Sequence, residues 1–406
     1  MLKTVIPDRL IYRTHYLSAI EPFIDQPLVK VLVGQRRVGK SYMLYQLMND
    51  IARKYPDAAQ IYLNKEDLAF DTIKNAGDLN RYILDNTPEH KKTFVFIDEI
   101  QDIDFFEKTL RSLALQKNYD LYCTGSNAKM LSGELATLLS GRYIEFYIHS
   151  LSYSEFLEFH DLDADSGSLK KYLTFGGLPQ LSRLGDDDEV RWEYLRNIVN
   201  TIVYKDVVMR YNVRNTRFLN RLIRFLADNT GSIFSAKRIS DFLKSQKINI
   251  SHNQVQIYTE YLCNAFLTYR LDRLDIIGRK MFEIGEKFYF TDTGIRNSIV
   301  GYKPEDIHKI IENAVCNHLQ FCGYNVKTGQ AGSLEIDFVA EKRNEKMYIQ
   351  VAWRLDTLAT IEREFGNLKR IPDNYPKMVI TMDEKFANTS DGIRHLHLSE
   401  FLLNEW

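Results

Sequence analysis

A glycine-rich loop between an apolar strand and a helical segment constrains the fold of this chain more than any other feature. The loop, GQRRVGKS at residues 34–41, fits the pattern GxxxxGK[ST]; it follows an apolar run at 28–33 and precedes a helical composition at 41–53. In this context backbone N–H groups surround phosphates at the start of a helix. Lys40 would reach the terminal phosphates and the Ser41 hydroxyl would ligate Mg²⁺. We therefore predict an α/β domain that binds ATP with Mg²⁺.

A chance glycine-rich turn is the alternative, but it would not explain why a strand and a helix flank the loop. The residues expected to bind the nucleotide from this segment are Gly34, Gln35, Arg36, Arg37, Val38, Gly39, Lys40, Ser41 and Tyr42.

Two acids follow a second apolar run, at residues 94–97, and complete the expected phosphate site. Ligands bind at the carboxyl ends of strands in open α/β sheets, so Asp98 would meet the metal ion opposite Ser41. Glu99 would be the base that orients and deprotonates the attacking water. A solvated acidic loop after a core strand is the alternative interpretation.

Further polar residues end a third strand and precede a fourth. Thr124, Ser126 and Asn127 are placed to sense the terminal phosphate or to hold the water, and the sequence does not decide among them; Ser126 is taken as the catalytic candidate. Arg142 comes just before the next apolar strand and would stabilise charge during phosphoryl transfer. If Arg142 acts on a neighbouring subunit, the protein forms a homo-oligomer. A helix C-terminal cap is the alternative role for this arginine.

These motifs, with "TGSNA" at 124–128, "SGR" at 140–142 and "TFGGLPQLS" at 174–182, resemble the AAA+-like P-loop ATPases that carry a DUF4143-type C-terminal region. The resemblance spans nearly the whole chain. It implies that Arg142 stands at the arginine-finger position and that Pro179 belongs to a motif in the lid near the base. The alternative for "GGLP" is a turn between helices, which glycine and proline favour.

Residues 235–290 read as a helix, a turn, a second helix and two strands, which is the order of a winged helix. Double-stranded DNA is a candidate partner of this segment. Polar residues at the start of the second helix could read bases and nearby cations could contact phosphates. A rigid lid or a protein-docking module is the alternative. The residues concerned are Ser251, His252, Asn253 and Gln254 for bases, and Lys237, Arg238, Lys244 and Lys247 for phosphates.

The C-terminal part has the layout of a restriction-endonuclease-like fold, but its second strand lacks the usual chemistry. Strand alternation places Glu335 and Asp337 on one face, with Glu312 contributed by the preceding helix. The next strand offers Gln350 and Ala352, where such nucleases carry an acid and a lysine. Metal-dependent cleavage needs carboxylates and usually that lysine. We therefore expect an inactive nuclease fold that serves binding or assembly.

Length and composition set the domain organisation and the compartment. A chain of 406 residues is too long for one core, and 45% hydrophobic with 26% charged residues is ordinary for a globular protein. We predict an ATPase domain at 1–150, a helical lid at 151–215, a winged helix at 216–300 and the nuclease-like domain at 301–406. No run of residues suits a membrane span, and four cysteines without metal spacing suggest the cytoplasm. The net charge of −1 gives no global attraction to nucleic acid.

The leading hypothesis is an ATP-hydrolysing switch or motor, with DNA as a candidate target. One alternative is an ATP-dependent nuclease, which would need Glu335, Asp337 and Gln350 to hold a metal ion productively. Another is a nucleotide-gated regulatory or protein-binding module in which hydrolysis is slow.

Overall fold

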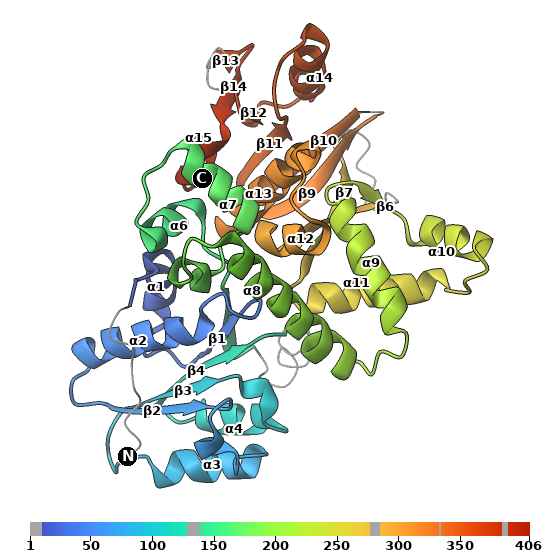
Figure 1. Ribbon diagram of the computed structural model, residues 1–406. Coiled ribbons are helices and arrows are strands. Elements are labelled where there is room, and N and C mark those ends of the chain that lie inside the picture. Colours follow the sequence, from blue (N-terminus) through green and yellow to red (C-terminus); the bar gives the residue numbers. More distant parts are fainter. Residues whose placement is uncertain (1–9, 128–138, 140, 277–284, 333, 384–388) are drawn as a thin grey trace. The chain divides into compact units, whose positions relative to one another are not determined.

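The computed structural model describes residues 10–127, 139, 141–276, 285–332, 334–383 and 389–406 (Figure 1). It divides into two compact units. Unit 1 comprises residues 1–149 and 264–266, and unit 2 comprises residues 150–263 and 267–406. Within the described residues, no helix is both long enough and apolar enough to cross a membrane.

A parallel sheet organises unit 1. Its described strands stand in the order β2-β3-β4-β1-β5, and every neighbouring pair is parallel. The strands are β1 (Val29–Val33), β2 (Ala59–Asn64), β3 (Thr93–Asp98), β4 (Tyr119–Gly125) and β5 (Tyr143–Tyr147). Every residue of β1, β3 and β4 is buried, as expected for a parallel sheet covered on both faces.

Helices cover the two faces of this sheet. They are α1 (Thr14–Ile20), α2 (Lys40–Lys54), α3 (Ala76–Asp85) and α4 (Phe106–Leu113). Figure 1 shows α2 on one face and α3 and α4 on the other. Leu79 and Ile83 of α3 and Leu110 and Leu113 of α4 join the hydrophobic core formed with the strands. The sheet confirms the predicted α/β class of this part of the chain.

Along the chain, the helices of unit 2 come before, between and after its strands. They are α6 (Tyr153–His160), α7 (Ser166–Phe175), α8 (Asp188–Thr201), the π-helix η6 (Ile202–Met209), α9 (Thr216–Asp228), α10 (Ala236–Ser245), α11 (His252–Asn264), α12 (Thr293–Val300), α13 (Ile307–Phe321), α14 (Leu358–Lys369) and α15 (Leu398–Leu403). A 3-10 helix also runs from Pro179 to Arg183. In α9, buried residues such as Leu219 and Leu222 alternate at helical spacing with exposed arginines, so the helix has one core-facing side.

One sheet of nine described strands runs through unit 2 in the order β13-β14-β12-β11-β10-β9-β7-β8-β6. The strands are β6 (Ile233–Phe234), β7 (Thr268–Asp275), β8 (Glu286–Phe290), β9 (Asn325–Ala331), β10 (Leu334–Lys342), β11 (Glu345–Val351), β12 (Lys377–Thr381), β13 (Thr389–Ser390) and β14 (Ile393–His397). The antiparallel strands β6, β8 and β7 join the rest through parallel pairing of β7 with β9. The segments predicted as separate winged-helix and nuclease-like domains thus share one sheet.

Candidate functional site

The backbone of the loop at residues 34–41 requires its two glycines. Gly34 has φ 148°, and a Cβ atom there would lie 2.1 Å from the carbonyl oxygen of Ile148. Gly39 has φ 98° and stands directly before α2. Among the described residues, no side chain caps the start of α2. The first-turn N–H groups of this helix therefore remain available to a phosphate.

Lys40 lies inside the curve of this loop. Its side chain is buried, and its ammonium group donates to the carbonyl oxygens of Gly34 (3.1 Å) and Gln35 (2.9 Å). Gln35 is also buried, and neither polar atom of its amide has a hydrogen-bond partner among the described residues. Buried polar groups are rarely left unsatisfied, so this loop has the chemistry of a site for a polar, anionic ligand.

Asp98 and Ser41 come together across the carboxyl edge of the sheet. β4 lies between β1 and β3, so Thr124 stands between the loop strand and the acid strand. The hydroxyl of Thr124 donates to Asp98 at 2.5 Å and accepts the backbone N–H of Glu99 at 2.9 Å. Burial raises the pKa of Asp98, and hydrogen bonds from Ser41 and Thr124 offset only part of that increase. The predicted metal ligands Ser41 and Asp98 are thus hydrogen-bonded to each other.

Glu99 is held in its ionised form beside them. Burial on its own would raise the pKa of Glu99, but the charge of Lys40, the amide of Gln101, the charge of Arg36 and the hydroxyl of Ser126 together lower it. Glu99 also has φ 54°, so its backbone leaves the strand in the left-handed region. An ionised, buried carboxylate next to a phosphate loop is suited to accept a proton from water.

Several partners of these acids are not indicated by the sequence pattern. Thr124, one of the three candidates at the end of its strand, contacts both Asp98 and Glu99. Gln101, whose amide donates to Glu99, and Tyr62, whose hydroxyl donates to Asp98 at 3.3 Å, are further partners. Tyr62 comes from β2, and only the pairing of β2 with β3 shows that it lies near the acids.

Arg142 lies at the opposite edge of the sheet from the phosphate loop. It is exposed and directly precedes β5, and its carbonyl oxygen accepts the N–H of Val29 at the start of β1. The phosphate loop begins directly after Val33. The five residues of β1 therefore separate Arg142 from the loop by about 15 Å. Arg142 is therefore not part of the loop's own surroundings within unit 1.

The glycines of "GGLP" have packing roles within unit 2. The N–H of Gly177 donates to Asp292 at 2.8 Å, and a Cβ atom at this glycine would lie 2.4 Å from the carbonyl oxygen of Leu151. Asp292 in turn caps the start of α12. Pro179 begins the 3-10 helix that follows, and its role toward the nucleotide stays a prediction.

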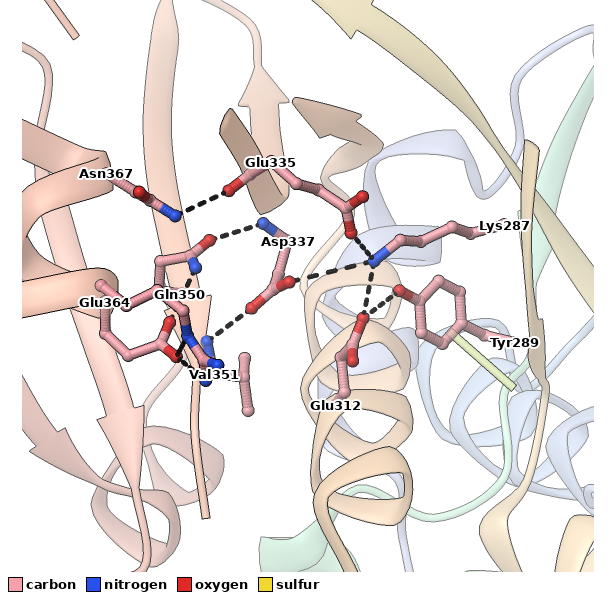
Figure 2. A network of polar contacts seen from close by, with 10 residues as sticks. Lys287, Tyr289, Glu312, Glu335, Asp337, Gln350, Val351, Glu364 and Asn367 are labelled. Carbon is pink, nitrogen blue, oxygen red and sulfur yellow. Dashed lines mark hydrogen bonds and ion pairs between the residues drawn. The ribbon is translucent and has the colours of Figure 1, made fainter. Parts of the chain in front are cut away.

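The four residues predicted for the nuclease-like site do gather in one place (Figure 2). Glu312 comes from α13, Glu335 and Asp337 from β10, and Gln350 from β11. Gln350 accepts the N–H of Asp337 at 2.7 Å. It also donates to Glu364, a buried carboxylate on α14, at 2.8 Å.

A lysine that the sequence analysis did not include stands in the middle of these carboxylates (Figure 2). The ammonium nitrogen of Lys287 lies 2.7 Å from Glu335, 3.1 Å from Glu312 and 3.9 Å from Asp337. Burial lowers the pKa of Lys287, but the three carboxylates raise it by more, so the lysine stays charged. The described residues hold no cluster of three or more His, Cys, Asp or Glu side chains that could bind a metal ion.

The cations and polar residues predicted to contact DNA lie on α10, on α11 and in the turn between them. Lys237, Arg238, Lys244 and Lys247 are exposed. Ser251 accepts the N–H of Gln254 at 3.2 Å, which is the role of a helix cap. Residues 277–284, between β7 and β8, lie outside the described residues.

Two family models match the chain. One, described as "AAA domain", matches residues 26–157, which contain the loop and both acids. The other, "Domain of unknown function (DUF8612)", matches residues 166–306. The middle of the chain therefore matches this second model in place of the DUF4143-type region that the sequence resemblance named.

Solved structures similar to this chain include the ORC1 protein of Aeropyrum pernix in complex with DNA and DnaA bound to AMPPCP and single-stranded DNA. The first has 13% identity and a TM-score of 0.33, and covers 73% of this chain and 94% of that one. The second has 17% identity and a TM-score of 0.33, and covers 64% and 92%.

Two relatives align over almost their full lengths. An uncharacterized protein of Haemophilus influenzae is 35% identical over 400 residues, which cover 97% of this chain and 99% of that protein. An uncharacterized protein of Methanocaldococcus jannaschii is 30% identical over 391 residues, which cover 91% and 86%. Together with the matching domain model, these relatives show that the chain belongs to a family of AAA-domain proteins that extends from Haemophilus influenzae to Methanocaldococcus jannaschii.

Proposed function

We propose that this protein is a Mg²⁺-dependent ATPase that works as a nucleotide-driven switch or motor. The observation that carries the proposal is the contact among four residues at the carboxyl edge of the unit 1 sheet. Ser41 and Thr124 are hydrogen-bonded to Asp98, and Glu99 beside them has a lowered pKa. This is the arrangement that a phosphate loop needs for a metal ligand and a base.

The residues present fit Mg·ATP. The uncapped start of α2, the ammonium group of Lys40 and the unsatisfied amide of Gln35 supply donors to phosphate oxygens. Ser41 and Asp98 would hold Mg²⁺, which neutralises phosphate charge when bound. Glu99 would accept the proton of the attacking water, and Gln101 fixes the direction of its carboxylate.

Arg142 would act on the nucleotide of a neighbouring subunit. It lies about 15 Å from the phosphate loop of its own unit, which is beyond the reach of an arginine side chain. It is exposed at the far edge of the sheet, where another subunit could approach. This position supports a homo-oligomer in which each site is completed in trans.

A nucleotide-gated module with slow hydrolysis is the second candidate, and the same position of Arg142 favours it. A subunit without a neighbour would bind nucleotide but would lack the arginine. It would therefore turn over slowly until it assembled.

Unit 2 would carry the output of the ATPase without cutting nucleic acid. Helices α9, α10 and α11 with strands β6, β8 and β7 occur in the order of a winged helix, which supports DNA as a partner. In the nuclease-like region, Lys287 takes the central place among the carboxylates that a metal ion would need. Ala352, which directly follows β11, supplies no ammonium group, so both parts of the cleavage chemistry are missing.

Nucleotide binding tests the proposal at the loop. Mg·ATP at about one hundred times its Kd should stabilise the wild type against thermal unfolding by about 2.7 kcal/mol. Lys40→Ala should lose this stabilisation. Lys54→Ala, at the exposed end of the same helix, is the matched control and should keep it. Equal stabilisation of both variants by Mg·ATP would overturn the assignment of the loop.

A further inference from the structure

A strongly cationic surface lies on unit 2, and none of its lining residues comes from α10 or α11. It is an open groove of about 490 Å³ bounded by α8, η6, α9 and α12. Figure 1 shows α8, α9 and α12 close together, and α12 contacts both other helices. Four arginines line this groove, and its lining contains neither aspartate nor glutamate. In a chain of net charge −1, such a concentration of positive charge is local to this surface.

Three of these arginines, on α9, are held without counter-ions. Arg217, Arg221 and Arg224 are all exposed, and none takes part in an ion pair or a side-chain hydrogen bond within the part of the chain that the structure describes. Like charges four residues apart on a helix disfavour the helix. The buried side of α9, which includes Leu219 and Leu222, keeps the arginines pointing outward nonetheless. An anion bound in the groove would relieve their repulsion.

The fourth arginine and two amides complete a surface of hydrogen-bond donors. Arg196 pairs with Glu189, but both side chains are largely exposed, so this ion pair is weak and exchangeable. Asn200 and Asn220 also line the groove, and their amide groups can donate to phosphate oxygens. Guanidinium groups match phosphate oxygens with two parallel hydrogen bonds.

The spacing of the arginines fits a polymer with regularly repeated charge. Arg217, Arg221 and Arg224 share one face of α9 and extend over about 10 Å along its axis. This length equals the axial rise of about three nucleotides in one strand of a duplex. A single phosphate would meet only one or two of these side chains.

We propose that this arginine groove binds the phosphate backbone of double-stranded nucleic acid without reading its sequence. The inference deepens the DNA part of the proposed function and does not rest on ATP hydrolysis. It places the backbone contacts on α8 and α9, whereas the sequence had pointed to α10 and α11. Backbone contacts of this kind position a nucleic acid and make its binding depend on salt.

Binding of a fluorescein-labelled DNA duplex of mixed sequence, followed by anisotropy, tests the groove. The assay uses the full chain without nucleotide or Mg²⁺, at NaCl concentrations between about 50 and 200 mM. The groove variant is R217Q/R221Q/R224Q. The matched control is K170Q/R343Q/R370Q, which removes the same charge from exposed positions of unit 2 outside the groove and outside α10 and α11.

The wild type should bind the duplex, with an affinity that falls steeply as salt rises. The groove variant should bind at least about 10-fold more weakly, and its slope of log K against log salt should be shallower by about 2.7, for three lost phosphate contacts. The control variant should lose much less affinity for the duplex. Thermal unfolding should not be lowered in either variant, since the replaced side chains are exposed and the groove variant also loses the repulsion among its arginines.

Three results would overturn the inference. The first is an equal loss of duplex affinity in the groove variant and the control variant. The second is displacement of the labelled duplex by polyglutamate as readily as by unlabelled duplex. The third is a wild type that does not bind the duplex. The second result would identify an acidic protein segment as the ligand. Glu99→Gln should bind duplex as the wild type does, so failure of the groove and failure of the ATPase proposal give different outcomes.

Discussion

Lys287 shows how a single side chain can change the chemistry of a carboxylate cluster. Glu312, Glu335 and Asp337 would repel one another if they were ionised without a counter-ion, and burial would add to the cost. The ammonium group from β8 offsets part of both effects, although burial and the charge of Glu312 still raise the pKa of Asp337. It also occupies the place that a divalent cation would need.

Replacing Lys287 should destabilise the protein and expose a latent cation site. Lys287→Met leaves the three carboxylates without their buried partner, and we expect a loss of about 3–5 kcal/mol in the free energy of unfolding. Mn²⁺ should restore part of this loss in the variant and leave the wild type unchanged. Thermal unfolding with and without Mn²⁺ measures both effects.

Lys327→Met is the matched control for this change. Lys327 pairs with Glu341 on the same sheet, but both side chains are about one-third exposed, so the loss should stay below about 1 kcal/mol. A Lys287→Met protein as stable as the control, with no response to Mn²⁺, would show that the carboxylates do not need a cation.

At the scale of single residues, the sequence predicted the positions that follow a local pattern and missed those that depend on strand pairing. Strand alternation identified Glu335 and Asp337 as neighbours on one face of β10. Lys287 could not be found in this way. It lies on another strand, and its approach to the carboxylates depends on the parallel pairing of β7 with β9.

The packing of α12 against α7 is an element-level feature that depends on one glycine. A Cβ atom at Gly294 would lie 1.9 Å from the carbonyl oxygen of Phe175, which belongs to the end of α7. Backbone atoms cannot give way as the end of a side chain can. The two helices can therefore approach this closely only because residue 294 has no side chain.

Gly294→Ala should lower the free energy of unfolding by about 1–3 kcal/mol or more, since the helices must move apart. Gly366→Ala is the matched control, because Gly366 also lies in a helix and nothing stands within 4 Å of its added Cβ. The control should gain about 0.5–1 kcal/mol from the better helix propensity of alanine. Chemical denaturation of both variants measures this contrast, and similar values would show that α12 does not constrain α7.

Element types were predictable where the hydrophobic spacing was regular, as in α13, whose buried residues include Ile310, Ile311 and Leu319. The segment after α8 has no such regular spacing, and the chain changes to the π-helix η6 at Ile202. Its apolar residues recur at intervals of four, as from Val203 to Val207, and at intervals of five, as from Ile202 to Val207. Such mixed spacing has no single helical period.

At the scale of the whole molecule, the sequence predicted a chain of four domains, and these boundaries stay a prediction. What it could not show is that strands from residues 233–290 and 325–397 form one continuous sheet. Pairing between distant strands leaves no local pattern in either one. The shared sheet explains how a lysine from one segment reaches carboxylates of the other.

Assembly should control turnover if Arg142 acts in trans. Arg142→Ala should lower the maximal rate of ATP hydrolysis by about 10³-fold, in the range of arginine fingers. Mixing it with the otherwise inactive Glu99→Gln should restore activity, because some sites would then combine an intact Glu99 with an intact arginine. Arg111→Ala, another exposed arginine of unit 1, is the control and should behave as the wild type.

Light scattering should show oligomers over the concentrations at which the specific activity of the wild type rises. Activity that is independent of protein concentration, with no recovery on mixing, would contradict a role in trans.

The measurement that tests the central claim most directly is steady-state ATP hydrolysis by the wild type and Glu99→Gln, with Glu89→Gln as an exposed control in the same unit. The account predicts that the wild type and Glu89→Gln hydrolyse Mg·ATP. Glu99→Gln should bind it equally well but turn it over about 10²–10⁴-fold more slowly, because the base is lost. Hydrolysis by Glu99→Gln at the wild-type rate would contradict the account, as would a wild type that binds Mg·ATP and never hydrolyses it.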